Sequence, residues 1–215
     1  DAGKFSADEA MVGYVGASTY AEVVSGYTSF FLGVRSVCPT ATMKVTFTGS
    51  WYDEALEKEG AQKLIDMGCK LISQHADSMG APTACEDAGI PNVSYNGSTG
   101  KACPNTYIIS SRINWAPYYE YAIKAVMDGT TIDTDWTGTL ATGSVVLTDL
   151  NTAVAAEGTA EAIAAATEKL EKGELHVFDT ATFTTRADDT MNAFKVDFLK
   201  VDADGHITSY LADVD

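Results

Sequence analysis

The sequence lacks the long apolar run that a membrane span requires. No stretch of its 215 residues approaches the roughly 20 consecutive apolar residues that cross a bilayer, and its first residues contain no apolar segment typical of a signal peptide. Basic residues are also scarce, because 14 Lys and Arg face 30 Asp and Glu and give a formal net charge of −16. Nucleic-acid binding is not expected, since a phosphate backbone repels such a surface and no basic stripe interrupts it.

Motifs for metal, redox and nucleotide chemistry are missing too. The four cysteines show no C-x-x-C spacing, so neither a zinc site nor a redox dithiol is predicted. Whether they are free thiols or form one or two disulfides stays open at this point (Cys38, Cys69, Cys85 and Cys103). No glycine-rich phosphate loop follows an expected strand, and the acidic run at 202–205 lacks the later glutamate of a calcium loop. We predict no cofactor and no metal.

What remains is an α/β pattern. Short apolar runs alternate with amphipathic segments, which is typical of a parallel sheet flanked by helices. Strands are expected at 11–16, 43–48, 70–74, 92–95 and 107–110, and helices at 21–37, 52–67, 81–88 and 115–127. The pattern changes near Gly129. The remainder predicts a smaller mixed α/β C-terminal part, with a strand at 144–148, a helix at 157–172, a strand at 175–178 and a β-hairpin formed by 194–201 and 206–211.

Polar and aromatic side chains follow the expected strands. Ligands of open parallel sheets bind at the carboxyl ends of the strands, near a switch in strand order. The candidates at this edge are Ser18, Trp51, His75, Asp77, Asn96, Asn114 and Trp115. Their chemistry predicts a site for a small polar ligand with a flat face, held by stacking and a few hydrogen bonds.

An enzyme is the less favoured interpretation. Of the three histidines, His75 lies two residues from Asp77, and the two could act together as a general base. No serine or cysteine in a nucleophile-elbow motif accompanies them. We therefore expect a binding protein, and a small-molecule hydrolase stays open as an alternative.

Two stretches resemble a known family. Residues 49–53 (GSWYD) and 61–68 (AQKLIDMG) are similar to the basic membrane protein family of ABC-transporter substrate-binding lipoproteins. Further matches follow in the family's order, at 12–16, 33–39, 74–78, 114–119 and 173–178, so that the resemblance covers most of 11–183. It implies a type I periplasmic-binding-protein fold, in which two α/β lobes close over a ligand.

The resemblance also implies a ligand class and roles for three residues. Several characterised members of the family bind purine nucleosides or adenine, and Trp51 matches the aromatic residue that stacks on the base. Asn96 falls where nucleoside-binding relatives have an aspartate for the ribose hydroxyls, and Asn114 falls where they often carry a lysine. Both differences remove a charge, which leaves a nucleoside, a free base or another small polar ligand open.

Family members carry a further lobe before the strand at 11–16, so this chain is expected to lack the N-terminal lobe. The resemblance then implies a ligand-binding lobe at 1–113, a crossover helix, strand and helix that pack on the other lobe at 114–174, and a C-terminal strand and hairpin at 175–215. The apolar face of the helix at 115–127 should be exposed unless that lobe or a partner chain covers it (Tyr119, Ala122, Ile123 and Val126).

The partners implied by the family are a small-molecule ligand, with a purine nucleoside or base favoured, and an ABC permease. The implied location is outside the cytoplasm, as a membrane-anchored lipoprotein whose signal and lipobox are not present in this chain. A second alternative stays open, because an extracellular ligand-sensing domain of a signalling receptor shares this fold.

Overall fold

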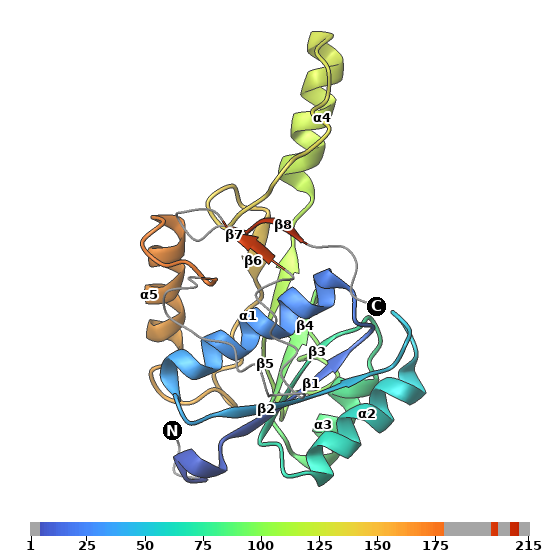
Figure 1. Cartoon of the computed structure of the whole chain (residues 1–215), viewed down its shortest axis with the longest axis vertical. Coiled ribbons are helices and arrows are strands. Elements are labelled where there is room, and N and C mark those ends of the chain that lie inside the picture. Colours follow the sequence, from blue (N-terminus) through green and yellow to red (C-terminus); the bar gives the residue numbers. More distant parts are fainter. Residues whose placement is uncertain (1–4, 179–198, 202–206, 211–215) are drawn as a thin grey trace.

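A six-stranded sheet forms the centre of the molecule (Figure 1). The computed structural model describes residues 5–178, 199–201 and 207–210. The strands are β1 (Met11–Gly16), β2 (Thr42–Phe47), β3 (Leu71–His75), β4 (Asn92–Tyr95), β5 (Tyr107–Ile113) and β6 (Val145–Leu147), in the spatial order β2-β1-β3-β4-β5-β6. β1 to β5 are parallel and β6 is antiparallel to β5. The predicted parallel sheet with flanking helices is therefore confirmed.

Helices cover both faces of the sheet. A 3-10 turn (Ala7–Glu9) precedes β1; α1 (Ala21–Val37) lies on one face, and α2 (Glu54–Asp66) and α3 (Gly80–Ala88) lie together on the other (Figure 1). Neighbouring residues of β1 pack on opposite faces of the sheet, because side chains alternate along a strand. Tyr14 packs with Tyr27 of α1, whereas Val15 packs with Leu64 of α2. This double cover explains why the predicted central strands are continuous apolar runs.

The helix α4 (Ala116–Asp128) projects away from the sheet (Figure 1). The loop after it runs back along one side, where Trp136 stacks on Tyr121 with their ring centroids 6.5 Å apart. The other side is open, with Tyr119, Ile123 and Val126 exposed. Exposure of the predicted apolar face is thus confirmed for these three residues, while Ala122 is half-buried.

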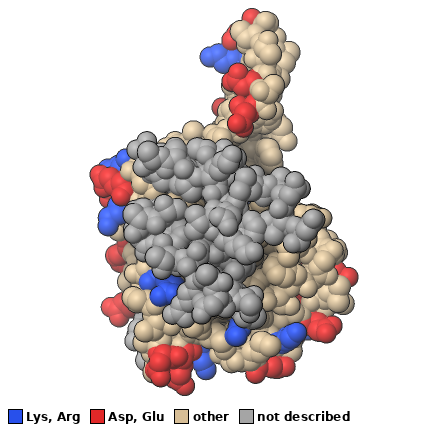
Figure 2. Space-filling view, in the orientation of Figure 1, with Lys and Arg blue, Asp and Glu red and all other residues tan. Residues whose placement is uncertain are grey.

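Acidic side chains dominate this projection. Between residues 116 and 138 the chain carries Glu120, Asp128, Asp133 and Asp135 against the single base Lys124, and Figure 2 shows red side chains along the projection. The local charge therefore has the same sign as the whole chain.

The C-terminal part differs from the prediction at one strand. Helix α5 (Thr159–Glu171) is present, but residues 175–178 form no strand. The reason is the helix end, because the backbone N–H groups of Glu174 and Leu175 both donate to the carbonyl of Lys169 and so are not available to a sheet. The predicted hairpin is confirmed where β7 (Leu199–Val201) pairs antiparallel with β8 (Ile207–Tyr210). The rest of that prediction, at 194–198, 206 and 211, lies outside the described residues.

The structure answers the question that the sequence left open about the cysteines. All four cysteines are free, and three of them are buried, namely Cys69, Cys85 and Cys103. Among the helices of the described residues, none combines the length and apolarity needed to cross a membrane.

Candidate ligand-binding site

The candidate site lies where the connections of the sheet diverge. β1 sits between β2 and β3, and the helix after β1 covers one face while the helix after β3 covers the other. A crevice forms at the carboxyl ends of two such strands. Gly16 and His75, the last residues of β1 and β3, are register partners, and the N–H of Ala17 donates to the carbonyl of His75 at 2.9 Å. Ser18 and Asp77 each lie two residues after these strand ends.

Trp51 reaches the same place from the loop after β2. The N–H of Thr48 donates to the carbonyl of Gly16 (3.0 Å), and the N–H of Asp77 donates to the carbonyl of Trp51 (2.8 Å). Gly49, with φ +76°, allows the sharp turn between them. The indole is 37% exposed. Its ring stacks on Tyr20 at 6.0 Å and lies 5.8 Å from the His75 ring, centroid to centroid.

His75 is the most unusual side chain at this edge. It is only 6% exposed, and its ring lies 4.3 Å from that of Tyr95 at the end of β4. Its Nε2 has no hydrogen-bond partner within the part of the chain that the structure describes. Burial lowers the pKa of His75, and the nearby Glu22 and Asp77 carboxylates oppose this shift. The imidazole is therefore neutral at pH 7 and keeps one unused polar atom.

Glu57 of α2 joins the two loops that carry Trp51 and Asp77. This carboxylate is fully buried. It accepts from the N–H of Asp53 (3.2 Å) in one loop and from the N–H of Ser78 (3.3 Å to each oxygen) in the other. Burial raises the pKa of Glu57, while the hydrogen bonds from Ser78 and Asp53 lower it.

Sequence reasoning missed Glu57, although a signal was present. It lies three, four and seven residues before Gly60, Ala61 and Leu64, on the apolar stripe of α2. A carboxylate on such a stripe must find backbone donors or another partner.

The remaining candidates lie toward the other side of the sheet. Asn96 follows β4 in a left-handed conformation (φ +57°), is exposed, and accepts from the N–H of Ile113 at 3.5 Å. The side chain of Asn114 is already engaged, since its Nδ2 donates to the carbonyl of Gly143 (2.9 Å) and its Oδ1 accepts from the N–H of Ala116. Trp115 is exposed and packs near Tyr119.

The sheet order separates these two groups. β5 lies three strands from β1, which at about 4.8 Å per strand is about 14 Å. The structure therefore brings Ser18, Trp51, His75 and Asp77 together and leaves Asn114 and Trp115 on a separate flank. β5 also runs to Ile113 rather than ending at Ser110 as predicted, so Arg112 lies within the strand.

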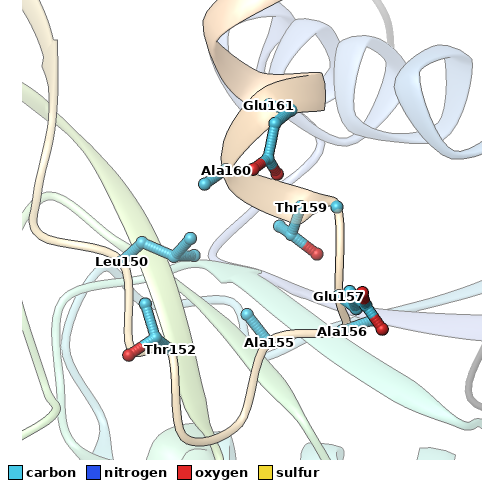
Figure 3. A pocket seen from close by; sticks show the side chains of 9 residues that line it. Leu150, Thr152, Ala155, Ala156, Glu157, Thr159, Ala160 and Glu161 are labelled. Carbon is cyan, nitrogen blue, oxygen red and sulfur yellow. The ribbon is translucent and has the colours of Figure 1, made fainter.

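Two cavities are present, and only one of them adjoins the candidate site. One, of about 340 Å³, adjoins the site beneath α1 and is lined by Phe30, Ser73, His75 and Tyr95 among others. The other, of about 350 Å³, lies at the start of α5 and is lined by Leu150, Thr152 and residues 155–161 (Figure 3). The Asn151 side chain there donates to the carbonyls of Pro104 and Tyr107 at the amino end of β5, so the second cavity lies at the opposite edge of the sheet from Trp51.

Comparison with known proteins identifies the family. The sequence model of the Bmp family, whose description is ABC transporter substrate-binding protein PnrA-like, matches residues 2–177. This chain belongs to that family. The resemblance found in the sequence is thereby confirmed.

Two curated relatives and one solved structure agree with this assignment. A protein of Haloferax volcanii named as an ABC transporter glucose-binding protein is 34% identical over 179 residues, 83% of this chain and 45% of that protein. A purine-binding protein of Brucella abortus is 39% identical over 120 residues, 56% of this chain and 34% of that protein. An ABC transporter solute-binding protein of Conexibacter woesei superimposes with a TM-score of 0.63 at 26% identity, covering 77% of this chain and 56% of that one. The chain spans less than half the length of the two curated relatives.

Proposed function

We propose that this chain supplies a ligand-binding lobe of an ABC-transporter substrate-binding protein and that its ligand is a purine base or nucleoside. The observation that carries the proposal is the convergence of Trp51, His75 and Asp77 at the β1/β3 strand ends, in a member of this family. The exposed indole offers a stacking surface, and the carboxylate and imidazole offer hydrogen bonds. This chemistry supports binding without turnover.

A purine is the ligand we favour because a flat heterocycle suits an exposed indole next to polar groups. The Brucella abortus relative carries purine binding in its name. The name of the Haloferax volcanii relative makes D-glucose the appropriate competing ligand, since a sugar ring also packs on an aromatic face.

The proposed partners follow from the same assignment. Residues 1–113 form the binding lobe, and the segment 114–174 reaches toward a second lobe that covers the exposed side of α4. Ligand binding draws the lobes together, and a membrane permease recognises the closed form, because closure requires a higher affinity of the ligand for the closed state. The protein acts outside the cytoplasm, anchored to the membrane as a lipoprotein.

Isothermal titration calorimetry and thermal unfolding with adenine, adenosine and D-glucose test this function. A ligand present at 100 times its Kd stabilises the folded state by about 2.7 kcal/mol, which raises Tm by roughly 5–11 °C in a chain of this size. We expect this shift with a purine, and we expect Trp51→Ala to weaken binding of that purine. Trp115→Ala is the matched control, because Trp115 is exposed on the flank beyond β5 and not at the carboxyl ends of β1 and β3.

Three results would contradict the proposal. The first is the absence of binding by any of the three compounds, and the second is a Kd that Trp51→Ala leaves unchanged. The third is conversion of a nucleoside to free base and sugar, which would favour the hydrolase alternative if His75→Ala abolished it.

A further inference from the structure

The imidazole of His75 leaves a polar atom unused in a buried place. The ring is more than nine-tenths buried, yet Nε2 has no hydrogen-bond partner among residues 5–178 and the two described C-terminal strands. Native structures normally satisfy buried polar atoms, and each exception calls for an explanation. A ligand atom that completes the bond is one such explanation.

Gly26 helps to fix the direction in which Nε2 points. A Cβ at position 26 would lie 2.6 Å from Nδ1 of His75, so the Nδ1 side of the ring packs against the backbone of α1. Nε2 lies instead near Glu22, one turn earlier in α1 and closer to its first residue. The amino end of α1 follows the carboxyl end of β1, and Nε2 therefore faces the edge of the sheet where Trp51 lies.

Glu22 provides the second half of the arrangement. Its Oε1 lies 3.9 Å from Nε2, and its side chain is 67% exposed. This separation is too long for a direct hydrogen bond. The two atoms are close enough for a single nitrogen or oxygen atom to lie about 2.8 Å from each. Because Nε2 has almost no exposed surface in this structure, such an atom reaches it only when the surrounding side chains move apart. Because a carboxylate only accepts hydrogen bonds, that atom must carry a hydrogen to donate.

The surrounding groups restrict the ligand further. Asp77, from the loop after β3, acts on His75 with the same sign of charge as Glu22. Burial raises the pKa of Tyr95, and the charges of Glu22 and Asp77 add to that shift. These two carboxylates, which both act on the charge of His75, also repel phosphate and carboxylate groups of a ligand. The space between Nε2 and Glu22 therefore favours an uncharged or cationic hydrogen-bond donor.

We propose that His75 Nε2 and the Glu22 carboxylate form a subsite for a hydrogen-bond-donating amino or hydroxyl group on the edge of a ligand that stacks on Trp51. The inference rests on the proposed function and deepens it, because it names the ligand group that the site selects. For a purine, that group is the exocyclic amino group of adenine. For a sugar, it is a ring hydroxyl.

Calorimetric titration of the chain with two probes that differ in one group tests this subsite. Adenine carries the amino group, and unsubstituted purine lacks it. We expect Glu22→Ala to weaken adenine binding about 10- to 100-fold, the usual effect of losing a hydrogen bond to a charged group. The same substitution should leave binding of unsubstituted purine unchanged, because no donor then faces the carboxylate. Glu59→Ala is the matched control, since Glu59 is an exposed carboxylate of α2.

A second variant guards against indirect effects. His75→Phe keeps an aromatic ring between Trp51 and Tyr95 but removes Nε2, and it should weaken adenine binding and spare purine binding in the same way. If D-glucose binds in place of adenine, the same three variants are titrated with D-glucose, and both Glu22→Ala and His75→Phe should weaken its binding.

The outcomes separate the subsite from the function. Wild-type affinity for adenine in Glu22→Ala, or an equal loss for adenine and unsubstituted purine, overturns the subsite and leaves the proposed function intact. If the wild-type chain binds neither adenine, adenosine nor D-glucose, the proposed function fails and the subsite fails with it.

Discussion

Replacing Glu57 by glutamine should loosen the two loops that present Trp51 and Asp77. The Glu57 carboxylate is fully buried and accepts from the N–H groups of Asp53 and Ser78. Glutamine has the same shape but offers one acceptor oxygen and an amino group. With the amide oxygen at the Oε1 position, the N–H groups of Asp53 and Ser78 both keep an acceptor. The amino group then takes the Oε2 position and faces the N–H of Ser78, so the loop that carries Asp77 loses one hydrogen bond and gains a donor–donor contact.

The distances set the size of the effect. A hydrogen bond to a charged group contributes about 1.5–3 kcal/mol, and bonds of 3.2–3.3 Å belong at the weak end of that range. Removing the buried charge also relieves its desolvation, which offsets part of the loss. We therefore expect Glu57→Gln to lower the free energy of unfolding by about 1–2 kcal/mol, and Glu57→Ala by about 2–3 kcal/mol, since alanine leaves both donors without an acceptor.

Urea denaturation measures this stability, and the fluorescence of Trp51 reports the loop. The chain has three tryptophans, so Trp115→Phe and Trp136→Phe leave Trp51 as the single reporter. In that background Glu57→Gln should make Trp51 more accessible to acrylamide quenching. Glu54→Gln, an exposed carboxylate one turn earlier, should change the stability by less than about 1 kcal/mol.

Loss of stability alone does not show that Glu57 holds the two loops together, because truncating any core residue also lowers the stability. Leu64→Ala provides that distinction, because Leu64 is buried on the same helix and its truncation costs about 2–5 kcal/mol. It should leave Trp51 quenching in the folded protein unchanged. The proposed role of Glu57 would be refuted if Trp51 were quenched equally in the Glu57 and Leu64 variants. It would also be refuted if Glu57→Gln changed neither the free energy of unfolding nor the quenching of Trp51.

Three further perturbations have definite expected results. Gly26→Ala would place its Cβ 2.6 Å from His75 Nδ1 and should lower the urea-derived stability by about 1–3 kcal/mol. Gly33→Ala, on the same helix with nothing within 4 Å, should raise it by about 0.5–1 kcal/mol, and equal effects of the two would contradict this reading. Burial lowers the pKa of His75 from its ordinary value of 6.5, so the folded protein disfavours the protonated imidazole. The contribution of His75 to the free energy of unfolding is therefore present above pH 6.5 and is lost as the pH falls. Wild type should therefore lose stability relative to His75→Phe between pH 7.5 and 5, and parallel pH profiles would contradict this. Since the net charge is −16, added NaCl should screen self-repulsion and raise Tm, and a Tm independent of salt would show that repulsion is unimportant.

The sheet and the edge that carries the candidate site could be predicted because they depend on local pattern. The strand at 11–16 coincides with β1 and that at 92–95 with β4, since apolar runs bounded by turn residues specify buried strands almost by themselves. Trp51, His75 and Asp77 follow such strands, and parallel strands end at one edge. The order of strands and helices along the chain is therefore enough to predict that these three residues lie close together.

The two strand boundaries that the sequence predicts wrongly depend on contacts outside the local pattern. The strand predicted at 175–178 satisfies its sequence pattern, but the end of α5 takes the backbone N–H of its first residue, Leu175. The apolar run predicts that the strand beginning at Tyr107 ends at Ser110, whereas pairing with β6 extends β5 to Ile113. In both places a neighbour distant from the pattern decides the conformation, as is usual for strands.

Glu22 and Glu57 show why the chemistry of the site could not be deduced from residue type. Both are glutamates in the first turn of a helix, and both lie beside a loop at the same sheet edge. Glu57 is buried, and its oxygens are occupied by two backbone N–H groups, so it can organise the loops but cannot meet a ligand. Glu22 is exposed and lies opposite an unused imidazole nitrogen, so it is free to select a ligand's donor group. Identical side chains thus take a structural and a proposed binding role according to burial and to the partners that the fold places around them.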